Sequence, residues 1–254
     1  MHLVMATKQR LDIILVDRGL FPSREQAQRA IRAGWVRVDG QILDKPSLEI
    51  KQEQEITVQA RSPYVSRGGE KLIGALQTFA IPVSDRLCLD GGISTGGFTD
   101  CLLQLGAKRV YGIDVGYGQV AWSIRSDPRV VLKERTNLRY LTPSALYGAE
   151  YAPTDMADLA VLDLSFISLT KVLSALWELL NPPREALLLV KPQFEAERSQ
   201  IGKNGLVRDP QVHEQVITKV MTAAKAIGWQ EKGRMPAPIK GRTGNQEYWL
   251  WLAV

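Results

Sequence analysis

The chain has 254 residues, of which 45% are hydrophobic and 23% are charged, and its formal net charge is +5. This composition is typical of a soluble globular protein and argues against disorder and fibrous repeats. No apolar run approaches the roughly 20 residues that cross a bilayer, and residues 1–10 lack the apolar stretch of a secretion signal. We therefore expect a cytoplasmic protein that does not enter the membrane.

Cysteine and histidine are scarce in this chain. Cys88 and Cys101 lack the spacing of a zinc motif, and two histidines are too few for most metal sites or histidine-based catalytic sites. We therefore predict no metal site. The chemistry is expected to rest on lysine, carboxylate or serine side chains, or on a bound cofactor.

Residues 1–60 have the pattern of a small α+β domain. Its predicted elements, in chain order, are helices over 10–18 and 23–34 and strands over 35–38, 41–43 and 56–58. Asp39 and Gly40 form a two-residue hairpin signal between the first two strands.

The positive charge is concentrated at the start of the chain, where residues 1–38 carry seven basic and three acidic side chains. Arg24, Gln28 and Arg32 recur every four residues and therefore share one face of the second helix. A solvated charged face is the ordinary explanation, but the helix leads into a strand that carries Arg37, which favours a surface that follows RNA phosphates. The predicted RNA-binding residues are Arg10, Arg24, Gln28, Arg32, Arg37 and Arg67.

Residues 61–65 form the expected linker, because Pro63 forces the preceding residue into an extended conformation. From residue 66 to 254 apolar strands alternate with helices, which indicates a mostly parallel sheet covered on both faces. The predicted strands cover 86–89, 110–113, 130–132, 159–162, 186–190 and 248–252, and the predicted helices cover 71–79, 97–105, 119–126, 169–180 and 210–227. The fold class is therefore α/β, with a Rossmann-like sheet preceded by a small α+β domain.

A glycine-rich loop over residues 90–97 joins the first strand of this sheet to a helix. Ligands of such sheets bind beyond the carboxyl ends of the strands, and glycines let the backbone approach a ligand closely. The next strand ends in Asp114, 22 residues after Gly92, where an acid accepts hydrogen bonds from ribose hydroxyls. Tight packing between strand and helix also explains a glycine-rich loop, but together with Asp114 the loop favours a nucleoside cofactor.

The acidic residue Asp90 at the strand end indicates which nucleoside. The dinucleotide and P-loop patterns are absent, and a pyrophosphate would be repelled by this carboxylate. S-adenosylmethionine, which carries an ammonium and a sulfonium beside its ribose, suits it. Asn137 is placed either to touch the adenine or to serve as a turn residue. The predicted cofactor-binding residues are Asp90, Gly91, Gly92, Ser94, Thr95, Gly96, Gly97, Asp114 and Asn137.

Four further charged residues stand at the ends of elements in this domain. Asp163 and Lys191 each follow a predicted strand, Glu247 precedes the last strand, and Lys71 opens the first helix. An ordinary ion pair at a domain rim would explain any one of them. Because strand ends at one edge of a parallel sheet converge, we predict that all four form a single catalytic site.

This set of side chains suits methyl transfer to a ribose 2′-hydroxyl, which must lose its proton as the methyl group arrives. A lysine accepts that proton only when burial and a neighbouring positive charge lower its pKa from about 10.4. Lys71 supplies such a charge, and Asp163 and Glu247 can orient both ammonium groups. Lys191 is therefore either the base or the residue that orients the deprotonated oxygen.

Nearly the whole chain resembles the TlyA (hemolysin A) family. The resemblance is carried by residues 23–24, 31–34, 36–40, 65–72, 94–100, 114–119, 134–137, 163–169, 190–195 and 244–248. It implies an S4-type RNA-binding domain over 1–60 and an FtsJ/RrmJ-like, S-adenosylmethionine-dependent methyltransferase domain over 66–254. It also implies 2′-O-methylation of cytidine in ribosomal RNA, in subunits or assembled ribosomes, by the tetrad Lys71, Asp163, Lys191 and Glu247.

The linker departs from the family pattern, because members can carry Arg-x-Trp-Val where this chain has Arg61-Ser62-Pro63-Tyr64-Val65. The main alternative function is a non-catalytic ribosome-assembly factor that keeps the fold, which predicts a broken tetrad or a filled cofactor loop. A pore-forming hemolysin lacks support in the residues, and a small-molecule substrate leaves the basic domain without a role. A monomer is favoured.

Overall fold

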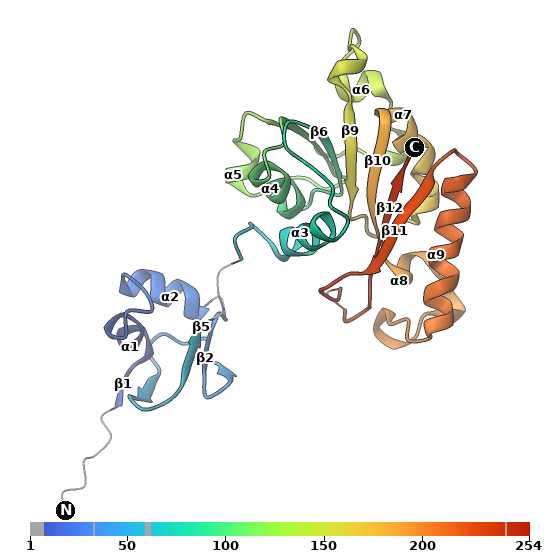
Figure 1. Cartoon of the computed structure of the whole chain (residues 1–254). Helices are drawn as coiled ribbons and strands as arrows, with labels where there is room; N and C mark the ends of the chain where they lie inside the picture. The colour runs from blue at the N-terminus through green and yellow to red at the C-terminus, as the bar shows by residue number, and fades with distance from the viewer. Residues whose placement is uncertain (1–7, 33, 59–61, 242) are drawn as a thin grey trace, which may run out of the picture. The chain divides into compact units, whose positions relative to one another are not determined.

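The computed structural model describes residues 8–32, 34–58, 62–241 and 243–254. Two compact units make up the chain, Met1–Ser62 and Pro63–Val254, and both are drawn in Figure 1. Arg61, the first residue of the expected linker, and residue 33 of the second predicted helix lie outside the described residues.

The first unit is a small α+β structure. Its elements are β1 (Lys8–Arg10), α1 (Leu11–Asp17), α2 (Arg24–Arg32), β2 (Val36–Val38), β3 (Gln41–Ile42), β4 (Glu49–Lys51) and β5 (Ile56–Val58). The strands pair antiparallel, in the order β3-β2-β5 and as β1 with β4. Asp39 and Gly40 both have positive φ, at 50° and 79°, which is the geometry of the predicted two-residue hairpin. Apolar side chains of α1, α2 and β2 form the core.

The second unit is a seven-stranded sheet with helices on both faces. Its strands are β6 (Leu87–Gly91), β7 (Arg109–Ile113), β8 (Val130–Lys133), β9 (Ala157–Leu162), β10 (Leu180–Val190), β11 (Gln230–Pro236) and β12 (Tyr248–Ala253). Its α-helices are α3 (Arg67–Thr78), α4 (Gly97–Gln104), α5 (Trp122–Arg125), α6 (Pro143–Tyr147), α7 (Leu173–Leu179), α8 (Pro192–Glu195) and α9 (Pro210–Lys225). The strand order is β11-β12-β10-β9-β6-β7-β8, and β12 pairs antiparallel with both of its neighbours.

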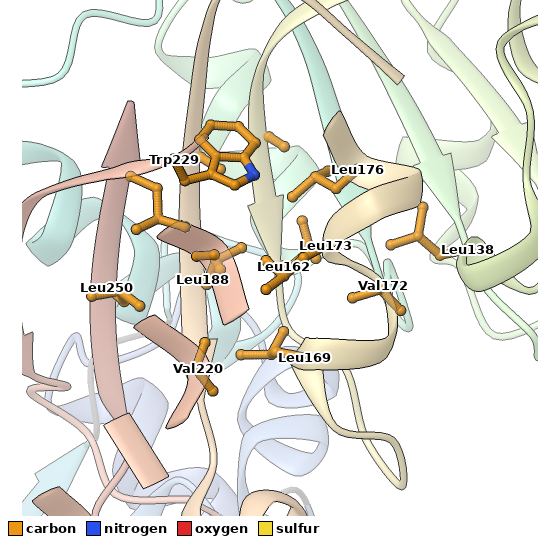
Figure 2. Packing of buried hydrophobic residues seen from close by; sticks show 14 of the residues in the cluster. Leu138, Leu162, Leu169, Val172, Leu173, Leu176, Leu188, Val220, Trp229 and Leu250 are labelled. Atoms are coloured by element: carbon orange, nitrogen blue, oxygen red, sulfur yellow. The ribbon is translucent and has the colours of Figure 1, made fainter. Parts of the chain in front are cut away.

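Alternation along the strands divides the apolar side chains between two cores. Helices α6, α7 and α9 cover one face, and α3, α4 and α5 cover the other. Figure 2 shows the first face, where Leu162, Leu188 and Leu250 from three strands pack against Leu176 of α7 and Val220 of α9. Because both faces are covered, the sheet leaves only its edges and strand ends for binding.

Several elements differ from the sequence-based expectations. Residues 119–126 form only the short helix α5, and the helix expected over 169–180 is split into a 3-10 turn at Leu169–Lys171 and α7. Strand β10 begins at Leu180, six residues before the predicted start, with a register shift before Glu185. The sequence analysis did not predict β1, β4, α6, α8 or β11.

The direction of β12 positions one of the predicted catalytic residues. Parallel strands β6, β7, β9 and β10 all end at the same edge of the sheet, whereas β12 begins there, with Tyr248 opposite Val190. Glu247 therefore reaches the edge where Lys191 follows β10. The sequence analysis placed both residues at one edge without recognising that the last strand is antiparallel.

Candidate active site

The glycine-rich loop leaves β6 at the carboxyl edge of the sheet. Gly92 has φ +85°, and a Cβ there would lie 2.7 Å from the backbone oxygen of Asp163. The loop thus passes close to the end of β9, which only glycine permits at this position. Gly96, with φ +96°, is the N-cap of α4.

Asp90 lies beneath this loop and is fully buried. Its Oδ2 accepts hydrogen bonds from the backbone N–H of Thr99 at 3.0 Å and from its Oγ1 at 2.7 Å. Its Oδ1 has no hydrogen-bond partner among the described residues. Burial raises the pKa of Asp90 to about 7, although the hydrogen bonds from Thr99 oppose the shift. This carboxylate therefore retains an unused buried acceptor atom.

A pocket of about 1220 Å³ opens beside the loop at the ends of β6, β7 and β9. Asp114 lines it and accepts hydrogen bonds from the backbone N–H groups of Ser94 at 2.8 Å and Gly116 at 2.7 Å. Asn137 also lines the pocket, and its side chain accepts from the N–H of Arg139 at 3.0 Å. The turn role left open for Asn137 therefore has a structural basis, and its contact with the adenine stays a prediction.

The predicted cofactor residues separate into two groups. Gly92, Ser94, Asp114 and Asn137 line the pocket. Asp90, Gly91, Thr95, Gly96 and Gly97 are not among the lining residues. A Cβ on Gly97 would clash with the Ser66 side chain, so this glycine lets α3 and α4 pack closely.

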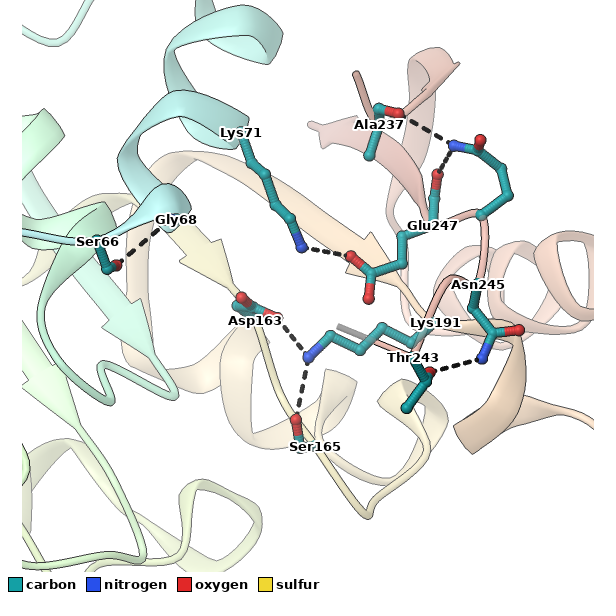
Figure 3. Close-up of polar contacts among 11 residues, drawn as sticks. Ser66, Gly68, Lys71, Asp163, Ser165, Lys191, Ala237, Thr243, Asn245 and Glu247 are labelled. Carbon is teal, nitrogen blue, oxygen red and sulfur yellow. Dashed lines mark hydrogen bonds and ion pairs between the residues drawn. The ribbon is translucent and has the colours of Figure 1, made fainter. Parts of the chain in front are cut away.

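The four predicted catalytic residues form two ion pairs at the same edge (Figure 3). Lys71 Nζ lies 2.6 Å from Glu247 Oε2, although 176 residues separate them in the chain. Lys191 Nζ lies 2.5 Å from Asp163 Oδ1. Figure 3 shows that both lysine side chains point toward the same region, with the Glu247 carboxylate between them. Asp163 belongs to the tetrad and also lines the pocket, so the two sites adjoin.

The surroundings of the ion pairs keep them largely out of solvent. The side chains of Lys71 and Lys191 are 12% and 11% exposed, and that of Glu247 is 3% exposed. Gly241 lies so close to the Glu247 carboxylate that a Cβ would clash with it. Charges held this way interact more strongly than charges in bulk water.

An aromatic pair, the exposed Phe166 and the half-buried Phe194, lies beside the lysine–aspartate ion pair. The sequence analysis did not select either residue. The Phe166 ring is 91% exposed, its backbone has φ +65°, and its centroid lies 5.1 Å from that of Phe194. Both residues line the pocket, and Lys191 Nζ lies 5.8 Å from the Phe194 ring. Positive φ is rare for an aromatic residue, so its occurrence at this site points to a functional role.

In the first unit, three of the predicted RNA-binding residues surround one buried aspartate. Asp12 accepts hydrogen bonds from Arg10 at 2.9 and 3.0 Å, Arg24 at 3.1 Å and Gln28 at 2.7 Å. Arg10 lowers the pKa of Asp12 well below its usual range against the opposing effect of burial, and Gln28 and Arg24 add to this. The three side chains are therefore fixed relative to one another.

The other three predicted RNA-binding residues are exposed. Arg37 donates to the backbone oxygen of Gly40 within the hairpin. The side chains of Arg32 and Arg67 make no hydrogen bond or ion pair among the described residues. They are available for anionic partners.

A seven-stranded sheet with this order, a glycine-rich loop after its first parallel strand and two lysine–carboxylate pairs beside a pocket define a Rossmann-like methyltransferase fold. Residues 64–254 match the model of the FtsJ-like methyltransferases, and residues 9–56 match that of the S4 domain. Fibrillarin from Aeropyrum pernix, solved with S-adenosylmethionine, shares the fold at 15% identity, with a TM-score of 0.52 over 86% of this chain and 94% of its own.

Closer relatives share the complete two-domain organisation. A 16S/23S rRNA (cytidine-2′-O)-methyltransferase, TlyA, from Mycobacterium tuberculosis is 48% identical over 98% of this chain and 91% of its own length. A solved structure from Streptococcus thermophilus that bears the name hemolysin is 42% identical, with a TM-score of 0.73 over 98% of this chain and 89% of its own. The chain therefore belongs to the TlyA family of FtsJ-like methyltransferases. Among the described helices, none combines the length and apolar character needed to cross a bilayer.

Proposed function

We propose that this protein transfers a methyl group from S-adenosylmethionine to the 2′-hydroxyl of cytidine in ribosomal RNA. The observation that carries the proposal is the meeting of the Lys71–Glu247 and Lys191–Asp163 ion pairs beside a pocket lined by Asp114. The name of the M. tuberculosis relative supports ribosomal RNA and cytidine as the substrate.

The residues at the pocket fit the proposed methyl donor. S-adenosylmethionine, when bound, supplies a methyl group that its sulfonium makes electrophilic. Gly92 lines the pocket and lets the loop pass against the end of β9, and the Asp114 carboxylate, held by two backbone N–H groups, can accept hydrogen bonds from ribose hydroxyls. Asp90 has one buried oxygen without a hydrogen-bond partner among the described residues. When this carboxylate is ionised, its negative charge beneath the loop favours a cationic ligand.

The two ion pairs have separate tasks in this proposal. Lys191 orients the ribose 2′-oxygen and stabilises the negative charge that develops there, while the hydroxyl proton passes to solvent water and the oxygen gains the methyl group. Asp163 and Ser165 fix the Lys191 ammonium, at 2.5 Å and 3.0 Å. Lys71, held by Glu247, adds a second positive charge in the same region. Preorganised charges of this kind need no rearrangement during the reaction.

Each unit carries a surface that suits an RNA substrate. Exposed aromatic rings such as Phe166 stack on unpaired bases, and such stacking is worth about 1–3 kcal/mol per base. In the S4 unit, Arg10 and Arg24 form a fixed basic cluster around Asp12, and Arg32 and Arg37 supply further charge for phosphates. Arg67, at the start of α3 in the second unit, is a further exposed basic side chain.

The decisive experiment is mass-spectrometric mapping of 2′-O-methyl groups on ribosomal subunits incubated with the purified protein and labelled S-adenosylmethionine. We expect one or a few new methyl-cytidines with the wild-type protein and none with Lys191→Ala. Calorimetry should show that Lys191→Ala still binds S-adenosylmethionine. The matched control is Lys225→Ala at the exposed end of α9, which should methylate normally.

Each other outcome favours a different function. An unchanged map with the wild-type protein, together with altered subunit assembly in cells that lack the gene, would favour the non-catalytic assembly factor. Full methylation by Lys191→Ala would remove Lys191 from the mechanism. Methylation of a base rather than a ribose would contradict the assigned reaction.

A further inference from the structure

The loop over residues 163–168 carries three groups of the proposed site: Asp163, Ser165 and Phe166. Its first residue is anchored to β6, because the N–H of Asp163 donates to Gly91 O at 3.0 Å. Its middle contacts Lys191 through the 3.0 Å bond to Ser165 Oγ. The left-handed backbone at Phe166 costs conformational energy, so contacts elsewhere must hold the loop in this shape.

The far end of this loop is attached to Glu195, the last residue of α8. This side chain is only 3% exposed. Its Oε2 accepts a hydrogen bond from Ser168 Oγ at 2.5 Å, and its Oε1 accepts from the Leu169 backbone N–H at 2.6 Å. Burial raises the pKa of Glu195, whereas the bonds from Ser168 and Leu169 oppose that shift.

Helix α8 links this anchor to the proposed catalytic lysine. Lys191 is the N-cap of α8, and Glu195 lies four residues later, after one turn of the helix. The Lys219 ammonium of α9 donates to the Glu195 backbone oxygen at 2.6 Å and holds the end of that turn. Lys191 thus contacts the beginning of the loop through Asp163 and Ser165, and Glu195 contacts its end.

We propose that Glu195 is a positioning residue for the methyl transfer: by binding Ser168 and Leu169, it fixes the loop that places Asp163, Ser165 and Phe166 around Lys191. This inference rests on the proposed function and extends it to a residue that does not line the pocket. A small displacement of reacting groups reduces a rate steeply, so loss of the anchor should affect turnover more than binding.

The test compares Glu195→Ala and Glu195→Gln with Glu197→Ala, an exposed carboxylate two residues away. We expect Glu195→Ala to lower kcat by about a hundredfold, while the Kd for S-adenosylmethionine stays within about twofold of wild type. Glu195→Gln should restore most of kcat, because its amide oxygen accepts from the Leu169 N–H and its amide nitrogen donates to Ser168. Glu197→Ala should match the wild type.

Hydrogen exchange identifies the physical cause. In Glu195→Ala, amides of residues 164–169 should exchange faster while those of β9 stay protected, at a temperature well below unfolding. If Glu195→Ala does not fold, Ser168→Ala removes one of the two bonds and should give a smaller loss of kcat in the same direction. A purely structural role predicts a lower unfolding midpoint with unchanged kcat in the folded protein.

Failure of this inference differs from failure of the proposed function. Normal kcat in folded Glu195→Ala, or in Ser168→Ala where the first variant does not fold, overturns the positioning role and leaves the methyltransferase assignment intact. Absence of ribose methylation by the wild-type protein overturns the assignment and removes the basis of the inference with it. Equal loss of kcat in Glu195→Ala and Glu197→Ala would also overturn the positioning role of Glu195, because the loss of one negative charge would then explain the effect.

Discussion

Asp12 in the first unit and Asp90 in the second are both buried aspartates, but their surroundings are opposite. Asp12 is bonded to two arginines and a glutamine, and its pKa lies well below the usual range. Asp90 accepts hydrogen bonds only from Thr99, leaves Oδ1 unpaired among the described residues, and has a pKa raised to about 7.

Under the proposed function, these two environments suit ligands of opposite charge. In the first unit the carboxylate is satisfied within the protein, and it holds in place two arginines that the proposed function assigns to RNA phosphates. In the second unit the carboxylate carries an unsatisfied acceptor beside a pocket, which favours a ligand that brings positive charge.

The largest effect is expected from a substitution in the glycine-rich loop that follows Asp90. Gly92→Ala would combine a left-handed backbone, which costs about 1–2 kcal/mol for a residue with a side chain, with a clash against the backbone oxygen of Asp163. We expect loss of detectable S-adenosylmethionine binding by calorimetry and loss of methylation. Gly118→Ala is the control, because φ there is +72° and a Cβ would meet no described atom within 4 Å. Equal effects of the two substitutions would contradict the close approach at Gly92.

The second prediction concerns the pH dependence of Asp90. Because its pKa in the folded state is raised from 3.8 to about 7, its contribution to stability is fully present below about pH 4 and is lost as the pH rises toward 7. That loss is about 4 kcal/mol. Thermal unfolding of the unliganded protein should therefore show less pH dependence between 4 and 7 in Asp90→Asn than in the wild type.

The ionisation of Asp90 should also make the affinity for a cationic ligand depend on pH, in the opposite direction to stability. If S-adenosylmethionine binds the ionised carboxylate, its affinity should fall about fivefold from pH 7 to pH 6, because the ionised fraction of Asp90 falls by that factor, and Asp90→Asn should remove that dependence. Calorimetry in buffers of different ionisation enthalpy would count the protons released. No release by the wild-type protein near pH 7 would mean that Asp90 does not sense the ligand.

Much of the second unit could be predicted from its sequence, because strands such as Leu159–Leu162 are continuous apolar runs that only a sheet covered on both faces can bury. Strand β11 was missed because Gln230–Pro236 is polar and mostly exposed at the sheet edge. Strands β1 and β4 each have three residues, too few to show a period. The helix expected over 169–180 divides because Val172 leaves the regular helix between its two parts.

The site was only partly predictable, for a different reason. Charged residues at strand ends stand out in a sequence, so the four members of the tetrad could be selected. Their pairing could not, since Lys71 reaches Glu247 only because β12 is antiparallel. Phe166 could not be found either, because nothing in the sequence signals a left-handed aromatic residue. Glu195 was quoted only as part of a family motif, and its two bonds to the catalytic loop depend on tertiary packing.

The third prediction concerns the hydrogen bonds that Asp12 accepts in the first unit. Asp12→Asn removes the charge that Arg10 and Arg24 share, which should lower the stability of this unit by about 2 kcal/mol. Hydrogen exchange of α1 and α2 amides would measure this loss, and RNA affinity should fall although the protein has gained net positive charge. Asp17→Asn changes the same charge at the exposed end of α1 and should have little effect. Stronger RNA binding by Asp12→Asn would show that net charge outweighs alignment.

The smallest effect is expected from Arg32, which extends the same face of α2 but has no ion pair among the described residues. Arg32→Ala should weaken RNA binding modestly and reduce the slope of log affinity against log salt concentration by about one, the signature of a single phosphate contact. Arg29→Ala is the matched control, because Arg29 pairs with Glu25 on the same helix at 2.9 Å. Since neither arginine contacts Asp12, a fall in salt slope for Arg32 alone would separate direct phosphate contact from alignment by the buried aspartate. Equal slopes for both variants would mean that this face of α2 acts only through its total charge.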